Sequence, residues 1–316
     1  MASVDTATTG KSGSQHRSSE RTLLASIVQK LALGTAQFGL PYGVANRTGV
    51  VTSTEGRLIL DEALARGIDT LDTAVGYGES EKVLGRLNVA GFRVVSKLPG
   101  VPNECCDVGY WFRGQLQASL HRLGVSALDG FLLHRPAQLM EPRGDEIYSA
   151  LVAAKDQGLI KKIGVSIYEP SELDALFLHF DFDIVQVPLN LLDRRFAESD
   201  WSANLRARGV EVHSRSCFLQ GLLLMPPAER PARFARFDSF WSCWDAWLKD
   251  SGLSALQACL RFSLSLPGID RVVIGVDSCA QLREIIEAAE GPIPAYPAWP
   301  VMPDPLLLNP SSWNSL

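Results

Sequence analysis

Eight short apolar runs, separated by stretches with helical periodicity, dominate the sequence from Lys30 onward. They are Leu31–Gly34, Ile68–Asp72, Arg93–Ser96, Gly130–Leu133, Lys162–Val165, Asp183–Val187, Gly209–Ser214 and Arg271–Ile274. Strands that alternate with helices are typical of α/β folds. Eight such units in succession favour a closed (β/α)8 TIM barrel over an open doubly wound sheet, which usually has fewer strands and a switch point. Residues 34–39 do not form the G-x-G-x-x-G motif of a Rossmann fold.

Helix boundaries can also be predicted from the sequence. Thr52-x-x-Glu55 has the pattern of a capping box, and Gly67 suits the position just after the end of that helix. Ser278-x-x-Gln281 suggests the same kind of start for the last helix of the barrel. These signals support a helix after the first and the eighth strand.

The chain length is compatible with one barrel, because single α/β barrels reach about 250 residues and more. Residues 1–28 are polar and lack periodicity, so we predict a disordered tail there. Residues 29–316 are then a single barrel domain, with an insertion near 225–250 and a Pro-rich C-terminal extension. The insertion carries Trp241, Trp244 and Trp247 at helical spacing. A role in the core and a role in substrate contact both stay open for these tryptophans.

Charge and cysteine content restrict the partners. The net charge of −5 and the isoelectric point near 5.6 give no basic footprint for nucleic acid. No apolar stretch approaches the ~20 residues that span a bilayer, and the first 20 residues lack the apolar region of a secretory signal. The six cysteines show neither a CxxC pair nor metal-ligand spacing. We therefore expect a cytoplasmic protein with a small-molecule partner, without nucleic acid, membrane or metal.

Four polar residues follow or end three consecutive strands. Asp72 ends the second run, Tyr77 lies in the loop after it, Lys97 follows the third run and His134 the fourth. In a barrel the carboxyl ends of the strands meet at the functional mouth. Asp72 alone could be a turn residue, Lys97 a solvated charge and His134 a core histidine. As a set they favour an active site.

These residue types suit proton donation to a carbonyl oxygen. A phenol has a pKa near 10, which is too high for an efficient acid at neutral pH. An ammonium beside it, from Lys97, favours the phenolate, and Asp72 supplies the counter-charge that a buried ammonium needs. His134 can donate a hydrogen bond to the same oxygen. We interpret Tyr77 as the proton donor of a carbonyl reduction.

Several segments resemble the signature segments of aldo-keto reductases. They are Leu33–Thr35, Asp72–Glu81, Val95–Leu98, Ser119–Gly124 and Leu132–Pro136. The resemblance extends over roughly Lys30 to Ala289 and implies a (β/α)8 barrel that reduces aldehydes or ketones with a nicotinamide cofactor. Asp72, Tyr77, Lys97 and His134 then match the catalytic tetrad of the family.

The resemblance also implies residues for the nicotinamide half of the cofactor. Ser166 and Gln186 match the ligands of the carboxamide, although Ile167 stands where an Asn usually follows. Arg215 takes the place of the aromatic ring that commonly stacks on nicotinamide, and a guanidinium plane can stack as well. The remaining residues expected along the nicotinamide and the pyrophosphate are Gly34, Thr35, Asp72, Ser216, Phe218 and Gly221.

The last unit of the barrel resembles the segment that holds the adenosine end. The residues expected there are Gly275, Ser278, Gln281 and Glu284. A helix start suits an anion. Arg283 is the one cation nearby in sequence, and Asp277 would oppose a 2′-phosphate if it pointed inward. The expected cofactor is NADPH, with NADH as the alternative and a preference within about tenfold, roughly 1.4 kcal/mol.

The sequence thus predicts an NAD(P)H-dependent reductase of an aldehyde or ketone, sugar-like compounds included. One alternative is a nicotinamide-binding barrel that acts as a regulatory or sensory subunit without significant turnover. Another is a metal-dependent hydrolase or lyase, which would require clusters of His or carboxylates at several strand ends. The sequence predicts neither the physiological substrate nor the oligomeric state.

Overall fold

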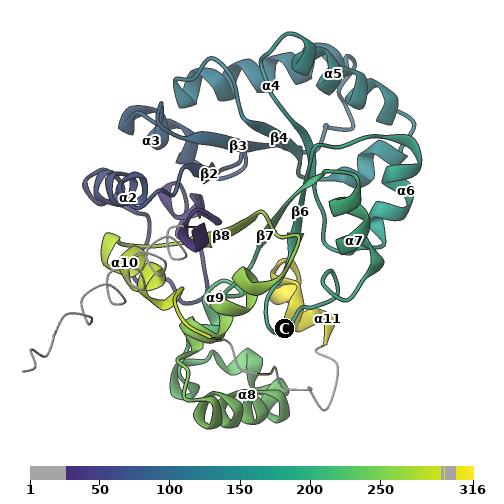
Figure 1. Ribbon diagram of the computed structural model, residues 1–316. Coiled ribbons are helices and arrows are strands. Elements are labelled where there is room, and N and C mark those ends of the chain that lie inside the picture. The colour runs from purple at the N-terminus through teal and green to yellow at the C-terminus, as the bar shows by residue number, and fades with distance from the viewer. Residues whose placement is uncertain (1–25, 293–294, 296–303) are drawn as a thin grey trace, which may run out of the picture.

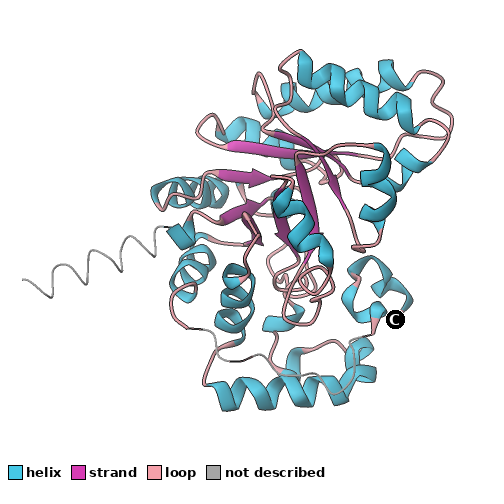
Figure 2. Cartoon of the chain, turned by 45° about the vertical axis from the view of Figure 1, so that its right-hand side comes forward, coloured by secondary structure: helices cyan, strands magenta, loops and turns pink. Residues whose placement is uncertain are grey.

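Eight parallel strands close into a barrel in chain order, surrounded by helices (Figures 1 and 2). The computed structural model describes residues 26–292, 295 and 304–316. Strands β1 and β8 close the barrel, with Leu31 paired to Val272 and Gly34 to Gly275. The strands are β1 Leu31–Gly34, β2 Thr70–Asp72, β3 Arg93–Leu98, β4 Gly130–Leu133, β5 Ile163–Ser166, β6 Ile184–Pro188, β7 Glu211–Arg215 and β8 Arg271–Gly275. The predicted (β/α)8 fold is confirmed.

Five strands continue further toward their carboxyl ends than the apolar runs predicted. They are β3, β5, β6, β7 and β8, and Ser166 of β5 and Arg215 of β7 still pair with the neighbouring strand. Apolar patterning detects only side chains that enter a core, whereas backbone pairing continues under the polar residues of the mouth. The missed residues therefore belong to the functional end of the barrel.

Helices pack around the outside of the strands, as Figure 2 shows. They are α2 Ser53–Ala65, α3 Ser80–Leu87, α4 Val108–Leu123, α5 Gly144–Asp156, α6 Glu172–His179, α7 Asp200–Ala207, α8 Asp238–Ser251, α9 Ala255–Ser265, α10 Cys279–Ala288 and α11 Pro305–Leu308. Gly67 follows α2 with a φ of +84°, a left-handed conformation that glycine adopts without strain.

The two predicted capping boxes form only by half. The Thr52 hydroxyl accepts the Glu55 N–H, and the Ser278 hydroxyl accepts the Gln281 N–H, as expected. The Glu55 carboxylate, however, accepts the N–H of Cys279 at 2.6 Å, so it connects α2 to the start of α10. The Gln281 side-chain carbonyl accepts the N–H of Asp277 at 2.7 Å. The Glu55 carboxylate and the Gln281 side chain therefore accept hydrogen bonds from other residues. Neither accepts the N–H of its own N-cap residue, as a complete capping box would require.

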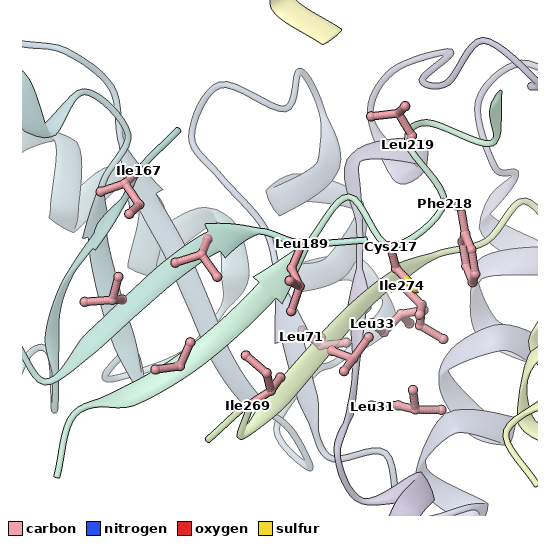
Figure 3. Close-up of a cluster of buried hydrophobic side chains, with 14 of the residues drawn as sticks. Leu31, Leu33, Leu71, Ile167, Leu189, Cys217, Phe218, Leu219, Ile269 and Ile274 are labelled. Atoms are coloured by element: carbon pink, nitrogen blue, oxygen red, sulfur yellow. The ribbon is translucent and has the colours of Figure 1, made fainter. Parts of the chain in front are cut away.

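The core has two layers because side chains alternate across each strand. Leu31, Leu33, Leu71 and Ile274 face outward into the layer between strands and helices (Figure 3). A smaller cluster of Val95, Leu132 and Ile184 fills the barrel interior. Burial of each such side chain contributes about 1.5–3 kcal/mol. The interior cluster leaves the carboxyl ends of the strands to polar side chains.

The three tryptophans of the insertion belong to a core. They lie on α8, at the bottom of Figure 1. Trp241 and Trp244 are buried, Trp247 is partly buried, and the Trp241 indole N–H donates to the carbonyl of Phe234 at 3.0 Å. The Phe234 ring also packs edge-on against Trp313, with ring centroids 4.8 Å apart. None of the tryptophans lines the cavity described below, so the core interpretation is supported over substrate contact.

Most of the predicted tail and much of the Pro-rich extension lie outside the described residues. Residues 26–28 are helical and Val28 is buried, so the packed domain includes them. Near the C-terminus, Leu307, Leu308 and Trp313 are buried. Within the described part of the chain, no helix is both long and apolar enough to span a membrane.

Candidate functional site

A cavity of about 540 Å³ opens at the carboxyl ends of the strands. It extends from Tyr77 and His134 at one end to the start of α10 at the other. Most of the residues predicted from the sequence line this cavity: Gly34, Thr35, Asp72, Tyr77, His134, Gln186, Arg215, Ser216, Phe218, Gly221, Gly275, Gln281 and Glu284. The barrel therefore brings residues from β1, β2, β4, β6, β7 and β8 to one site.

Three predicted residues do not line the cavity. Lys97 and Ser166 are buried behind it, with 1% and 2% of their surfaces exposed. Ser278 is the N-cap residue of α10, and its hydroxyl is engaged by the Gln281 N–H at 3.2 Å. The hydroxyl therefore caps α10, and a direct contact of Ser278 with the cofactor stays a prediction.

Asp72 and Lys97 form a buried ion pair beneath the cavity. The Lys97 Nζ lies 2.6 Å from Asp72 Oδ1, and it also donates to the carbonyl of Thr73 at 3.0 Å. Burial alone would lower the pKa of the Lys97 ammonium, but Asp72 and Tyr77 more than offset that effect, and the pKa is raised. Lys97 therefore stays charged, and its Nζ lies 5.1 Å from the centre of the Tyr77 ring.

His134 faces Tyr77 across the same end of the cavity. The two rings meet edge to face, with centroids 6.1 Å apart and planes at 79°. Burial and the cations of Lys97 and Arg215 lower the pKa of His134 to about 4. The imidazole is therefore neutral over the physiological range and can still donate one N–H. Together the two side chains provide an O–H and an N–H donor at one place.

Gln186 connects this cluster to the next strands. Its amide Nε2 donates to Asp72 Oδ2 at 2.7 Å, while its carbonyl accepts from the Ser166 hydroxyl at 3.3 Å. The Asp72 carboxylate thus receives a hydrogen bond on each oxygen, one from Lys97 and one from Gln186. Ser166 and Gln186 lie side by side, as the predicted pair of carboxamide ligands requires.

Arg215 extends from the end of β7 over the mouth. Its guanidinium donates to the carbonyl of Ile167 at 3.0 Å and to the hydroxyl of Ser216 at 3.3 Å. It also lies over the ring of Tyr168, 4.6 Å from its centre. Ile167, which replaces an expected Asn, is buried, and its backbone serves Arg215. The guanidinium plane is thereby fixed beside the reactive end of the cavity.

The segment predicted to follow the pyrophosphate has an unusual backbone. Ser216, Leu219 and Gln220 have positive φ values between 48° and 65°, and Gly221 has 85°. Left-handed conformations cost non-glycine residues of order 1 kcal/mol each and cluster at functional sites. Residues of this segment line the cavity next to the end of β7. Backbone strain of this kind is consistent with a segment shaped for a ligand.

The loop between β1 and α2, residues 39–51, closes over the cavity and was not predicted from the sequence. Its Val44 N–H donates to the carbonyl of Gln220 at 3.1 Å, and its Asn46 amide donates to Asp277 at 3.0 Å. A Cβ on Gly221 would lie only 2.6 Å from the Ala45 methyl group. The loop therefore connects the β7 side of the cavity to the β8 side.

Two tyrosines at the mouth were missed as well. Tyr42 and Tyr168 line the cavity near Arg215, one from the β1–α2 loop and one from the loop after β5. Burial and the neighbouring Tyr77 raise the pKa of Tyr42. Both residues lie in loops without periodicity, so only a complete loop structure could have identified them.

A buried hydrogen-bond network contains other residues of the segments that resemble the family. Glu81 is almost fully buried and accepts hydrogen bonds from Ser96 at 2.7 Å and Ser119 at 2.6 Å. The Arg122 guanidinium pairs with its second oxygen at 2.6 Å. Ser80, the neighbour of Glu81, donates to the carbonyl of Thr35 at 2.8 Å. These residues anchor α3 to β1, β3 and α4, and so hold the loop that carries Tyr77.

Comparison with known proteins assigns the fold to a family. The model of the Aldo/keto reductase family matches residues 30–297. The chain belongs to this family. Among its relatives, the uncharacterized oxidoreductase YqkF of Bacillus subtilis (strain 168) is 25% identical over 251 residues, which are 73% of this chain and 81% of that protein. Oxidoreductase sirO of Leptosphaeria maculans is 30% identical over 212 residues, 64% of this chain and 63% of its own length.

A further relative is the NADH-specific methylglyoxal reductase of Escherichia coli (strain K12), 26% identical over 191 residues, which are 51% of this chain and 56% of that enzyme. The holo form of an aldo-keto reductase from Bacillus halodurans superposes with a TM-score of 0.66 at 22% identity, covering 84% of this chain and 88% of that one. Family and relatives identify this protein as an oxidoreductase and support carbonyl reduction as its chemistry.

Proposed function

We propose that this protein reduces a small aldehyde or ketone with NADPH or NADH, and that Tyr77 is the proton donor. One observation carries the proposal. The Tyr77 ring lies beside a buried, charged Lys97, at one end of a cavity that continues to the start of α10. A dinucleotide requires such an elongated site, with the reacting ring at the catalytic end.

The shape of the cavity fits a bound dinucleotide. Gly275 ends β8 at the cavity wall, where a Cβ would lie 2.3 Å from the Gln37 amide. Glycine at this position lets the Gln37 side chain pack against β8, so both residues form the cavity wall without a side chain from Gly275. Gln186, held from behind by the Ser166 hydroxyl, would contact the carboxamide, Arg215 would stack on the ring, and Ser216–Gly221 would lie along the pyrophosphate.

The residues around Tyr77 suit general acid catalysis. When bound, the reduced nicotinamide supplies a hydride to the carbonyl carbon. The Tyr77 hydroxyl donates its proton to the carbonyl oxygen, and the Lys97 ammonium stabilises the phenolate that remains. Asp72 holds Lys97 in its charged form and in place. His134, neutral because its pKa is near 4, donates an N–H to the same oxygen and orients it.

The mouth of the cavity favours a polar substrate. Tyr42, Tyr168 and Arg215 surround the space above Tyr77 and His134. Their hydroxyl and guanidinium groups can donate hydrogen bonds to the oxygens of a polar substrate, which an apolar substrate could not accept. We infer a small carbonyl compound rich in oxygen, sugar-like compounds included. The six free cysteines support a reducing compartment such as the cytoplasm.

The direct test follows the absorbance of the reduced nicotinamide with a panel of sugars, aldehydes and ketones and with both cofactors. Turnover of several polar carbonyl compounds is the expected result. If the protein binds the dinucleotide but turns over none of the compounds, a regulatory or sensory barrel replaces the enzyme.

The Tyr77→Phe variant tests the acid itself. Loss of the hydroxyl should lower kcat by about 10²–10⁴-fold and leave the Kd of the cofactor nearly unchanged. Tyr110→Phe, which removes a hydroxyl from a side chain that is 73% exposed on α4, is the matched control. Retention of more than a tenth of the wild-type kcat by Tyr77→Phe would refute this role.

A further inference from the structure

The end of the cavity remote from Tyr77 determines which dinucleotide fits. If the nicotinamide lies against Tyr77, as the proposed function requires, the other half of the molecule extends toward the start of α10. Asp277, Gln281 and Glu284 line the cavity there. A 2′-phosphate, which distinguishes NADPH from NADH, would come to lie at this end.

This end of the cavity carries negative charge without a matching cation. Asp277 and Glu284 both line it, and among the described lining residues Arg215 is the one Lys or Arg side chain. Arg215 belongs to the opposite end, where its charge acts on His134. Arg283, the cation expected from the sequence, is 56% exposed and pairs with Glu62 of α2 at 2.8 Å. It does not line the cavity.

The start of α10 is also engaged by the protein itself. Backbone N–H groups at a helix start can bind a phosphate. Here the Cys279 N–H donates to the Glu55 carboxylate at 2.6 Å, and the Gln281 N–H donates to the Ser278 hydroxyl at 3.2 Å. The Glu55 carboxylate therefore occupies the N–H group at the start of α10 that would otherwise be available to bind a phosphate.

The position of Asp277 suits a ribose. Its Oδ1 accepts a hydrogen bond from Asn46 at 3.0 Å, which holds the carboxylate at the cavity wall. Burial raises the pKa of the Asp277 carboxyl, and hydrogen bonding with Asn46 and Gln281 only partly offsets that effect. A sugar hydroxyl would supply such a donor. An acidic side chain that accepts from the ribose 2′-hydroxyl is a common means of selecting NAD(H) in dinucleotide sites.

We propose that this enzyme selects NADH over NADPH, and that Asp277 is the residue that selects it. The Asp277 carboxylate accepts a hydrogen bond from the adenosine ribose and repels a 2′-phosphate. This reverses the modest NADPH preference expected from the sequence, because that expectation rested on Arg283 and on free N–H groups of α10. Like charges brought together at a binding site cost several kcal/mol, so the preference should be about a hundredfold or more.

The test measures Kd for NADH and for NADPH with the full-length protein, by titration calorimetry at fixed pH and ionic strength. We expect NADH to bind about a hundredfold tighter. Asp277→Asn should reduce that ratio at least tenfold, chiefly by tightening NADPH, and Asp277→Arg should bring it to one or below. Glu287→Gln removes one charge from an exposed position of α10, the helix that follows Asp277, and should leave the ratio unchanged.

The experiment distinguishes a failure of the proposed function from a failure of the role proposed for Asp277. Because the inference rests on the proposed function, a protein that binds neither dinucleotide refutes both. A protein that binds NADPH as tightly as NADH keeps the proposed function and refutes the role of Asp277. An equal response of the Kd ratio to Asp277→Asn and to Glu287→Gln also refutes it, because the effect would then follow net charge alone.

Discussion

Replacing Lys97 by Met tests the buried ion pair through stability as well as activity. Lys97 is 1% exposed, the Asp72 side chain is 5% exposed, and their charged atoms are 2.6 Å apart. The substitution keeps the volume nearly unchanged but leaves a buried carboxylate whose remaining partner is the Gln186 amide. Removing one partner of a buried pair typically costs 3–5 kcal/mol, a large part of the about 5–15 kcal/mol that stabilise a folded domain.

The double variant Lys97→Met/Asp72→Asn is the matched control. An Asn at position 72 can still accept the Gln186 amide but carries no charge, so the cost of an unpaired carboxylate disappears. We expect the double variant to regain at least half of the lost free energy of unfolding. Neither variant should regain turnover, because the phenolate left by Tyr77 has lost its ammonium in both.

Urea denaturation followed by circular dichroism gives the free energies, and the slope m shows whether unfolding stays two-state. Turnover is measured beside it with a substrate found in the panel. A Lys97→Met protein within 1 kcal/mol of the wild type would refute the buried pair. So would a double variant as unstable as the single one.

Three further predictions concern pH, the β1–α2 loop and the N-terminus. Because the pKa of His134 is near 4, protonation of this ring should reduce kcat/KM only as the pH falls through about 4, and an acid limb between pH 6 and 7 that His134→Gln removes would contradict this. Asn46→Ala removes a hydrogen bond to the Asp277 carboxylate and should speed cofactor dissociation at least about threefold in stopped-flow measurements, with an unchanged rate as the contrary result. Deletion of residues 1–24 should leave Tm and turnover unchanged, since a polar segment buries little apolar surface, and a Tm lowered by many degrees would show that it packs on the barrel.

The fold could be predicted because its pattern is local and repeated. Each apolar run reports a strand whose outward residues enter the core, and eight repeats leave few architectures. The site could be predicted for the same reason, since a barrel brings all carboxyl strand ends to one mouth. Asp72 and His134 can be singled out by their places at the ends of strands, whereas Gln186 is expected from the family resemblance. Tyr77, the proposed proton donor, lies only five residues past the end of β2.

The parts that could not be predicted depend on contacts between distant, aperiodic segments. Asn46 and Asp277 are 231 residues apart, and neither lies in a patterned stretch. Glu55 and Cys279 are 224 residues apart, and their contact requires that α2 pack against α10. Sequence patterns give the direction of side chains within one element, but not the partner that a loop or a helix end will find.

The half-formed cap of α2 shows how one unpredicted contact changes the expected cofactor preference. A Thr-x-x-Glu pattern predicts that the carboxylate stays at its own helix start. Glu55 instead reaches the first N–H of α10, which a reading of α10 alone would leave free for a phosphate. The same holds for Arg283, whose position in sequence suggests an anion ligand while its side chain pairs with Glu62. Both partners lie on α2, and without them the sequence alone favours NADPH. The proposed preference for NADH therefore rests on the α2–α10 contact and on Asp277, which can be seen only once both helices are in place.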